Sequence, residues 1–324
     1  VDRLDAIDQQ LLETWLRDCV LDGSKTSNPD LWGGIADDPD STFPKNSYAL
    51  HYVRSLALLG KAHDDPTKLT SWIQSRTANG DGSYNESISG GAEPTKATAS
   101  AVATLSTLGT LSIQNRTSSL SWFTTAQLNR GGFGMASDDV LAKASESCFV
   151  SICLGIIGET DCAVAEGLKS YFDSVETDLG FELQEALPTL MWTSWLSQAA
   201  RLVHAGGIAD YSATESYLSV LSGWPQYPFW NNLSVVSAVE YRPDQYRTQS
   251  VWSQYFGVLA AEAVAMQLSS DRVSETTNYL SQAQYLTGHY CPASFMGSAR
   301  ARLCVAAVEA LYLLDALDSI PYLF

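Results

Sequence analysis

The sequence has few basic residues. Its 19 lysines and arginines stand against 36 acidic residues, which gives the 324-residue chain a net charge of −17. Nucleic acids and anionic membrane surfaces bind clusters of lysine and arginine, so this balance argues against both as partners. It leaves room for an anionic ligand held by a few basic groups or through metal ions. The sequence also lacks an uninterrupted apolar run of the roughly 20 residues that a membrane-spanning helix needs.

Cysteine is scarce too, with six residues and no Cys-x-x-Cys pair, so a structural zinc site of the usual spacing is not expected. We interpret most of the cysteines as small core residues, and we favour a cytoplasmic location. Three Asn-x-Ser/Thr sequons, at Asn85, Asn115 and Asn232, and a chain that begins with Val1 leave secretion and a removed leader open. The Gly-x-Ser-x-Gly, phosphate-loop and paired-histidine motifs are missing as well.

What the sequence does contain is a repeat. Glycine-rich turns with an aromatic residue recur about 49, 50 and 48 residues apart. They are Trp32-Gly33-Gly34, Asp81-Gly82-Ser83-Tyr84, Gly131-Gly132-Phe133-Gly134 and Leu179-Gly180-Phe181. Between turns, a polar segment precedes an apolar helix, which is followed by an amphipathic helix. The apolar helix should be buried between layers, with the amphipathic helix covering it.

The repeat predicts roughly twelve helices in about six hairpins. The predicted ranges are 4–19, 47–60 with 67–77, 95–109 with 117–128, 144–158 with 163–175, 189–204 with 213–222, 248–267 with 273–286, and 298–317. We therefore predict an all-α fold, an α/α toroid with an inner and an outer ring of helices, forming a single domain over residues 1–324. An open solenoid of helical pairs is the alternative. The glycine-aromatic turns and a hairpin count near six favour closure.

Five segments over roughly residues 65–160 carry a family resemblance. They are Trp72-Ile73-Gln74-Ser75-Arg76, Asp81-Gly82-Ser83-Tyr84, Ala101-Val102-Ala103-Thr104-Leu105, Leu108-Gly109 and Gly131-Gly132-Phe133-Gly134. This pattern resembles the β subunit of protein prenyltransferases and, equally, the repeats of squalene and other terpenoid cyclases. The resemblance implies an α/α toroid whose central cavity binds long isoprenoid chains against aromatic walls. It says little about the reaction.

The zinc site of the protein prenyltransferases has no counterpart in this chain. That family holds zinc with an Asp and a Cys two residues apart at the start of the fourth inner helix, and with a His in the fifth. Thr189 and Met191 stand at the first two positions, and Trp252 or Ser253 at the third. These side chains do not form the tetrahedral site that activates a thiol, so no zinc is expected.

The diphosphate-binding residues of that family are kept in part. Gln184 and Glu185 stand where it has basic residues before the fourth inner helix. Lys96 and Lys143, however, stand where the resemblance places a diphosphate-binding Arg and His, at the entries of the second and third inner helices. The Asp-x-Asp-Asp acid of class II cyclases is missing, although Asp37-Asp38-Pro39-Asp40 is similarly acidic.

An acidic segment supplies the main candidate for catalysis. Asp138 and Asp139 precede Lys143 and Glu146, from a glycine-rich loop into the third inner helix. Carboxylates at this spacing can share Mg²⁺ ions that bridge to substrate phosphates, with Lys143 meeting the diphosphate directly. The alternative is structural, with Asp139 capping the helix and Glu146 paired on the surface.

A second metal set is possible at Asp37, Asp38 and Asp40, which otherwise form a solvated acidic loop. The pair Glu93 and Lys96 is a weaker candidate, and a helix-entry salt bridge explains it equally well.

The substrate-binding candidates are aromatic and basic. Trp192, Trp195, Trp252 and Tyr255 lie at inner-helix entries, where aromatic faces would stabilise cations or simply pack in the core. Arg247 and Arg300, with Arg242, precede inner helices five and six and would hold an anion. The four histidines do not cluster, and His51 in the first inner helix either lines the cavity or packs as an ordinary core residue.

These candidates support three hypotheses of function. The first is a Mg²⁺-assisted terpene cyclase, a lyase-like enzyme of secondary metabolism, or a prenyltransferase for small molecules, acting on a polyprenyl diphosphate. The second is a cyclase or pericyclase acting on a neutral polyene, for which the cavity alone matters. The third is a non-catalytic toroid that binds a ligand or a protein. The expected partner in the first two is a hydrophobic isoprenoid.

Overall fold

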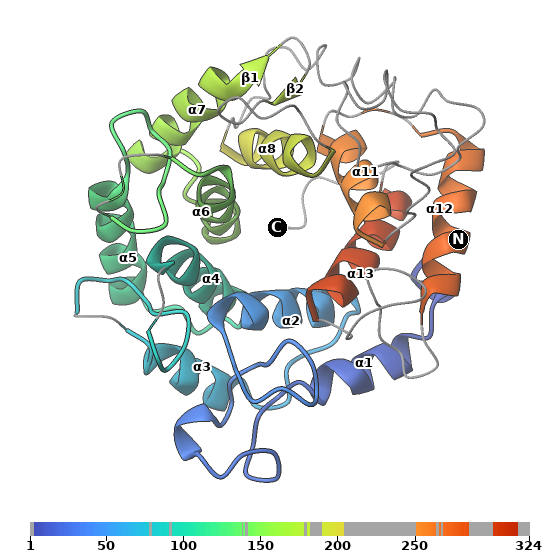
Figure 1. The fold of residues 1–324 in the computed structure, drawn as a ribbon, viewed down its shortest axis with the longest axis horizontal. Helices are drawn as coiled ribbons and strands as arrows, with labels where there is room; N and C mark the ends of the chain where they lie inside the picture. The colour runs from blue at the N-terminus through green and yellow to red at the C-terminus, as the bar shows by residue number, and fades with distance from the viewer. Residues whose placement is uncertain are drawn as a thin grey trace.

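The computed structural model describes residues 3–77, 80–90, 93–137, 139, 142–177, 180–181, 190–203, 251–263, 266, 268–284 and 301–316. Within these residues, six helices form the inner layer of a ring (Figure 1). They are α2 (Asn46–Leu58), α4 (Pro94–Thr107), α6 (Ala144–Ile157), α8 (Leu190–Val203), α11 (Val251–Ala263) and α13 (Ala301–Ala316). Each contacts the next in this order, and α13 contacts α2. The ring is therefore closed, which confirms the α/α toroid and excludes an open solenoid.

The outer layer covers the backs of these helices. Its described members are α1 (Gln9–Arg17), α3 (Pro66–Gln74), α5 (Ile113–Ala126), α7 (Ala163–Val175) and α12 (Ser270–Ala283). The remaining elements are the 3-10 helices η1 (Arg3–Ala6) and η2 (Pro29–Leu31) and the two-residue antiparallel strands β1 (Glu176–Thr177) and β2 (Gly180–Phe181). The predicted helix 213–222 lies outside the described residues. No described helix is long and apolar enough to cross a membrane.

Helix starts follow local capping chemistry, and three described starts differ from the prediction by more than one residue. One of them is the helix predicted from residue 273, which begins at Ser270 because the Ser269 hydroxyl accepts from the Arg272 N–H (3.3 Å). The predicted helix 4–19 is divided, because the Asp8 carboxylate accepts a hydrogen bond from the Leu11 N–H (2.9 Å) and begins α1 there. Helix α5 begins before residue 117, because the Ser112 hydroxyl accepts from the Asn115 N–H (3.1 Å). Its first turn includes the exposed Ile113, which breaks the apolar spacing.

Three glycines set the spacing between turns and outer helices. Gly33, Gly82 and Gly131 lie 49 residues apart and have φ of +84°, +97° and +87°. A Cβ atom at these positions would lie 2.8, 2.3 and 1.8 Å from the carbonyl oxygens of Lys68, Ser118 and Gly167. The turns therefore require glycine for two reasons, the left-handed backbone and the close approach of α3, α5 or α7.

The same turns are tied to the inner helices. The Tyr84 N–H donates to the Thr98 hydroxyl on α4, and the Phe133 N–H donates to the Ser147 hydroxyl on α6, each at 3.0 Å. The next turn also bonds to the preceding inner helix, since the Asn46 N–H donates to the Glu86 carbonyl at 3.0 Å. Because this arrangement repeats, the first residues of α2, α4 and α6 lie at one end of the ring.

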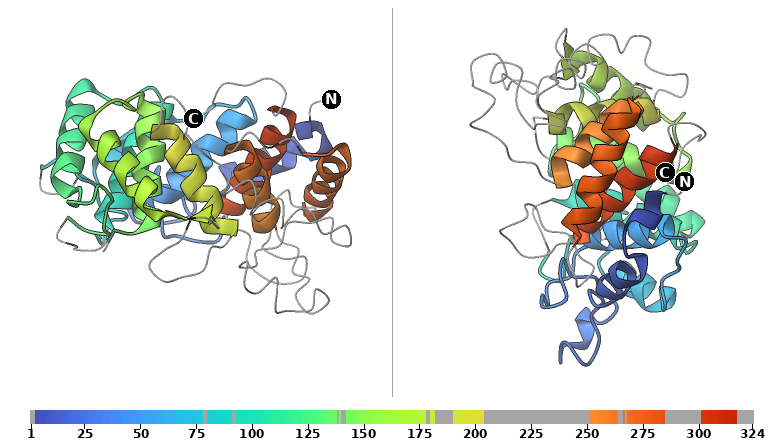
Figure 2. Two further views of the ribbon diagram at one scale, coloured as in Figure 1. Left: turned by 90° about the horizontal axis from the view of Figure 1, so that it is seen from above. Right: turned by 90° about the vertical axis from the view of Figure 1, so that its right-hand side faces the viewer.

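The N-terminal segment is bonded to the outer helix α12. The Ser281 hydroxyl of α12 donates to the Ala6 carbonyl (2.6 Å). Asp8 and Gln284 exchange two hydrogen bonds, from the Asp8 N–H to the Gln284 amide oxygen (2.7 Å) and from the Gln284 amide to the Asp8 carbonyl (2.9 Å). Both views in Figure 2 place this segment beside α12. The start of the chain and its last described outer helix are therefore held together.

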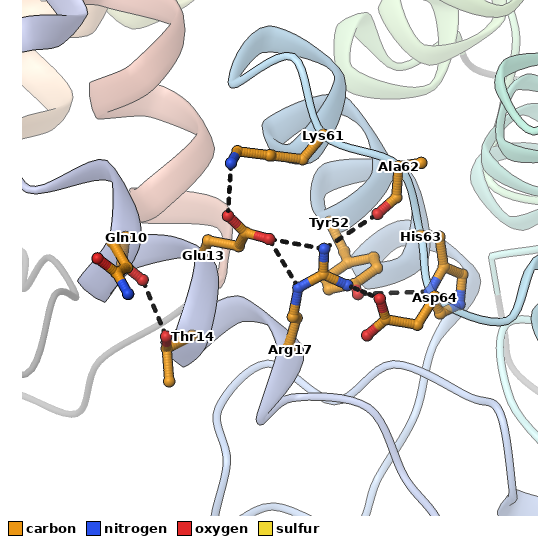
Figure 3. Close-up of polar contacts among 9 residues, drawn as sticks. All are labelled: Gln10, Glu13, Thr14, Arg17, Tyr52, Lys61, Ala62, His63 and Asp64. Carbon is orange, nitrogen blue, oxygen red and sulfur yellow. Dashed lines mark hydrogen bonds and ion pairs between the residues drawn. The ribbon is translucent and has the colours of Figure 1, made fainter.

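An ion-pair network anchors α1 to the loop after α2 (Figure 3). The Arg17 guanidinium donates twice to one Glu13 oxygen, at 3.0 and 2.7 Å, and once to the Ala62 carbonyl at 3.2 Å. It also pairs with Asp64 at 2.5 Å, while Lys61 lies 3.1 Å from the second Glu13 oxygen. These hydrogen bonds and charges lower the pKa of Glu13, with the Arg17 hydrogen bond the largest cause.

We expect Arg17→Met to lower the free energy of unfolding by about 1–2 kcal/mol, because it keeps the aliphatic stem and removes these contacts from the mostly buried Glu13. Urea denaturation measures the change. Lys68→Met is the matched control, since its ion pair with Asp65 is exposed and screened by solvent, so its loss should lower the stability clearly less. Equal losses in the two variants would show that the Figure 3 network adds no specific stability.

Candidate functional site

Several side chains on the inner helices keep part of their surface accessible although their helices are covered from outside. They are Tyr48 and His51 on α2, Lys96 on α4, Phe149 on α6 and Trp195 on α8. His51 is the clearest case. Burial is the largest cause of its lowered pKa, and yet part of the surface of this residue is still accessible. Because the outer helices cover the backs of the inner helices, we infer that this accessible surface faces the interior of the ring.

Lys96 occupies the centre of a charged group at the end of the ring where α2, α4 and α6 begin. Its ammonium lies 3.6 Å from Glu93 and 5.2 Å from the centroid of the Phe149 ring, a cation–π distance. Lys96 also acts electrostatically on Glu86, Glu146 and His51. We call Glu86, Glu93, Lys96 and Glu146 the acid–lysine cluster.

Glu146 is the cluster member with the most perturbed acidity. Its side chain is buried in the first turn of α6, with only 3% of its surface exposed. One carboxyl oxygen accepts from the Ser145 hydroxyl (3.2 Å), while Oε2 has no hydrogen-bond partner among the described residues. Burial, followed by the charge of Glu93, raises the pKa of Glu146 to about 7, and the cations Lys96 and Lys143 only partly oppose this. At neutral pH the group is thus available as an acid.

Glu86 is a second buried carboxyl group beside Lys96. It accepts a hydrogen bond from the Ser47 hydroxyl at the start of α2, and its Oε2 has no partner among the described residues. Burial raises the pKa of Glu86, opposed by the Ser47 hydrogen bond and by Lys96 and Lys45. The sequence interpretation missed this residue. The 49-residue period could have found it, because Glu86 occupies the position that Asp37 holds in the preceding unit.

The described members of the predicted acidic segment have different surroundings. The Asp139 carboxylate accepts from the backbone N–H groups of Met135 (2.6 Å) and Ala136 (3.2 Å), so it stabilises its own turn. Lys143 is the exposed N-cap residue of α6, and its ammonium lies against the Met135 sulfur. Asp138 lies outside the described residues. Glu146 is the buried member of this segment, and Lys143 acts on its charge from the start of the same helix.

No three His, Cys, Asp or Glu side chains in the described part of the chain lie together as metal ligands would. Mg²⁺ is often held by one or two carboxylates together with substrate phosphates, and Asp138 lies outside the described residues, so the Mg²⁺ set of Asp138, Asp139 and Glu146 stays a prediction. The alternative set lies on the loop that leads into α2, where Asp37 and Asp38 are half-buried and Asp40 is exposed. In that loop the Asp38 carboxylate accepts from the Asp40 N–H (3.0 Å), an arrangement typical of a turn.

The aromatic candidates have distinct surroundings. Trp195 packs edge-on against Phe256 of α11, with ring centroids 5.9 Å apart. The Tyr255 hydroxyl donates to Glu309 of α13 (3.0 Å), and Glu309 also pairs with Arg54 of α2. Tyr255 therefore joins the three inner helices at which the ring closes. Helices α8 and α11 contain Trp192 and Trp252, whose side chains the structure does not describe. The basic candidates Arg242, Arg247 and Arg300 lie outside the described residues.

Comparisons with solved structures find the same ring in proteins of low identity. The type II terpene cyclase MstE from Scytonema is 12% identical over 98% of this chain and 99% of its own, with a TM-score of 0.59. One MstE structure holds geranylgeranyl dihydroxybenzoate as substrate. The Candida albicans protein geranylgeranyltransferase-I, complexed with GGPP, is 12% identical over 84% of each chain, with a TM-score of 0.60.

An α-1,6-mannanase, GH76A of Salegentibacter sp. HEL1_6, is also 12% identical, over 98% of this chain and all of its own, with a TM-score of 0.57. At such identities these similarities show the fold, which proteins of different activity share. No curated protein matches the chain. The family model for the prenyltransferase alpha-alpha toroid domain, in contrast, matches residues 41–185 and 169–322. The chain belongs to the prenyltransferase alpha-alpha toroid family.

Proposed function

We propose that the protein is an isoprenoid cyclase whose reaction begins with a proton from Glu146. The observation that carries the proposal is the buried carboxyl group of Glu146, which lies in the first turn of α6 and whose pKa is raised to about 7. A general acid works best when its pKa lies near the working pH, because it is then both protonated and able to release its proton. The protonated site on the substrate would be a double bond or an epoxide.

The neighbours of Glu146 suit this role. Lys96 would stabilise the carboxylate that remains after proton transfer, since it already acts on the Glu146 charge. The aromatic side chains Tyr48, Phe149 and Trp195, partly accessible on α2, α6 and α8, would stabilise the carbocation. An isoprenoid substrate is supported by the family and by the geranylgeranyl compounds in the MstE and geranylgeranyltransferase structures.

Mg²⁺-assisted loss of diphosphate remains a second candidate. Lys96 favours it, because a partly accessible ammonium at a helix entry can meet an anionic leaving group. Its ligand set would need Asp138, which the structure does not describe, and Asp139, whose carboxylate is engaged with backbone N–H groups. We therefore place proton-initiated cyclisation first and keep the metal-dependent route as a prediction that chelation tests.

The discriminating experiment uses two substrates, geranylgeranyl diphosphate and geranylgeranyl dihydroxybenzoate, each with Mg²⁺ or with EDTA. Proton-initiated cyclisation predicts cyclic products in EDTA and no release of diphosphate. Diphosphate release that EDTA abolishes would support the metal-dependent route instead. If neither substrate is consumed under any condition, the cyclase proposal fails and a non-catalytic toroid is favoured.

The pH profile of the reaction carries a separate prediction. Because Glu146 acts in its protonated form, kcat/KM should be level on the acidic side of pH 7 and fall by about tenfold per pH unit on the alkaline side. Rate measurements between about pH 5.5 and 9 test this. A rate that rises through this range to an alkaline plateau would identify Glu146 as a base rather than an acid.

A further inference from the structure

His51 is a buried group at the ring interior that the proton-initiated step does not use. It lies on α2 one turn beyond Tyr48, so both side chains share a helix face. The imidazole of His51 lies deep among the inner helices, and part of the residue's surface is still accessible. We infer that it borders the interior of the toroid. Its Nδ1 atom is buried and has no hydrogen-bond partner among the described residues. Buried polar nitrogens are normally paired, so hydrogen bonding among the described residues does not account for a histidine at this position.

Burial, with two neighbouring cations, keeps the imidazole of His51 neutral. Burial is the main cause of its lowered pKa, and the cations Arg54 on α2 and Lys96 on α4 add to it, bringing the value to about 3. A neutral imidazole has one nitrogen lone pair that can accept a proton. Lys96 acts on both His51 and Glu146, so the neutral base and the protonated acid border the same region of the ring.

Resting on the proposed cyclase function, we propose that His51 accepts the proton that the final carbocation loses and thereby selects the product. In this step a C–H bond next to the cationic carbon breaks. Its electron pair forms the new C=C bond, and the proton bonds to the free lone pair of the His51 ring. The product is an alkene, and the cyclisation as a whole is an isomerisation.

The proton count of the cycle then closes within the site. Glu146 gives one proton to the substrate and His51 takes one back, so the imidazolium must return its proton to the Glu146 carboxylate. The two acidities favour this direction, because His51 has a pKa of about 3 and Glu146 of about 7. A carbocation needs only a weak base. A histidine of ordinary pKa would be partly protonated beside Glu146 at neutral pH, whereas His51 stays neutral and can accept a proton.

The test compares His51→Phe and His51→Gln with wild type, using geranylgeranyl dihydroxybenzoate. His63→Gln is the matched control, since His63 contacts Tyr52 from the loop after α2 in the Figure 3 network. Glu146 still starts the reaction in the His51 variants, so substrate consumption in a single turnover, with enzyme in excess over substrate, should stay within about threefold of wild type. The share of the wild-type alkene should fall by about tenfold or more, replaced by alcohols and isomeric alkenes. His63→Gln should keep the wild-type product.

The outcomes separate this inference from the cyclase proposal. If wild type forms no cyclic product, both fail together. If wild type cyclises the substrate and both His51 variants give the wild-type alkene in unchanged share, only the role of His51 is overturned. Loss of consumption in both variants with unchanged circular dichroism also overturns it, because His51 would then act before the cation forms.

Discussion

Replacing Glu146 with glutamine should lower kcat by about 10²–10⁴-fold, the usual contribution of a general acid. Glutamine has nearly the same shape but no proton to give, so the isoprenoid would enter the ring and remain linear. Product formation under saturating substrate measures the loss. Glu166→Gln on α7 is the control, because that carboxylate is exposed in an ion pair with Lys169 and should be dispensable. A Glu146→Gln enzyme with wild-type turnover would show that the acid lies elsewhere.

The same variant provides its own test of folding. The folded-state pKa of Glu146, about 7, lies above its ordinary value of 4.5, so the folded protein keeps this proton to higher pH than the unfolded chain does. The group's contribution to stability therefore falls as pH rises from 4.5 and reaches its lowest level above about 7. Removing a buried carboxylate should leave Glu146→Gln as stable as wild type, or more stable, at about pH 8. Loss of activity with stability kept assigns the effect to chemistry.

Replacing Gly131 with alanine should lower the free energy of unfolding by about 3 kcal/mol or more. The new Cβ would lie 1.8 Å from the Gly167 carbonyl oxygen on α7, so the turn and the outer helix must separate. Urea denaturation measures the loss. Gly109→Ala is the matched control, because Gly109 has φ of +69° and nothing within 4 Å of the added atom. It should cost only about 1–2 kcal/mol, from backbone strain alone.

Similar losses in the two glycine variants would contradict this explanation. The left-handed backbone, and not the close approach of α7, would then explain why glycine recurs every 49 residues at these turns. The periodic glycines would then be turn residues without a role in packing one unit against the next. Because Gly33 and Gly82 make the same kind of approach to α3 and α5, the result at Gly131 applies to the packing of all three units.

The fold was predictable because local chemistry and long-range packing agree in the repeats that the structure describes. The predicted ranges 144–158 and 163–175 match α6 and α7 to within a residue, since both helices have regular apolar spacing and a clear stop at Gly158. The start of α5 was predicted too late, because the Ser112 cap begins a polar, exposed turn that hydrophobic periodicity cannot register. Closure of the ring was favoured by the hairpin count and needed the contact of α13 with α2 to be confirmed.

The candidate site was predicted less completely. Lys96 and Glu146 were both named from the sequence, but as parts of separate groups, because residues 50 positions apart meet only when α4 packs against α6. The sequence could not distinguish Glu146, which is buried, from Asp139, whose carboxylate is bonded to its own turn. His51 was named from the sequence as a residue that lines the cavity or packs in the core, whereas its unpartnered nitrogen and the effect of Lys96 on it follow only from the packing of α2 against α4.

The most direct test of the central claim is the mass of the cyclic product formed in D₂O. The Glu146 proton exchanges with solvent before substrate binds, so an acid-initiated reaction transfers deuterium to the carbon or oxygen that is protonated first. With geranylgeranyl dihydroxybenzoate we predict a cyclic product that carries one carbon-bound solvent deuterium, formed by wild type and missing with Glu146→Gln. A cyclic product without solvent deuterium on carbon would contradict the account, because the ring would then close without a proton from the protein.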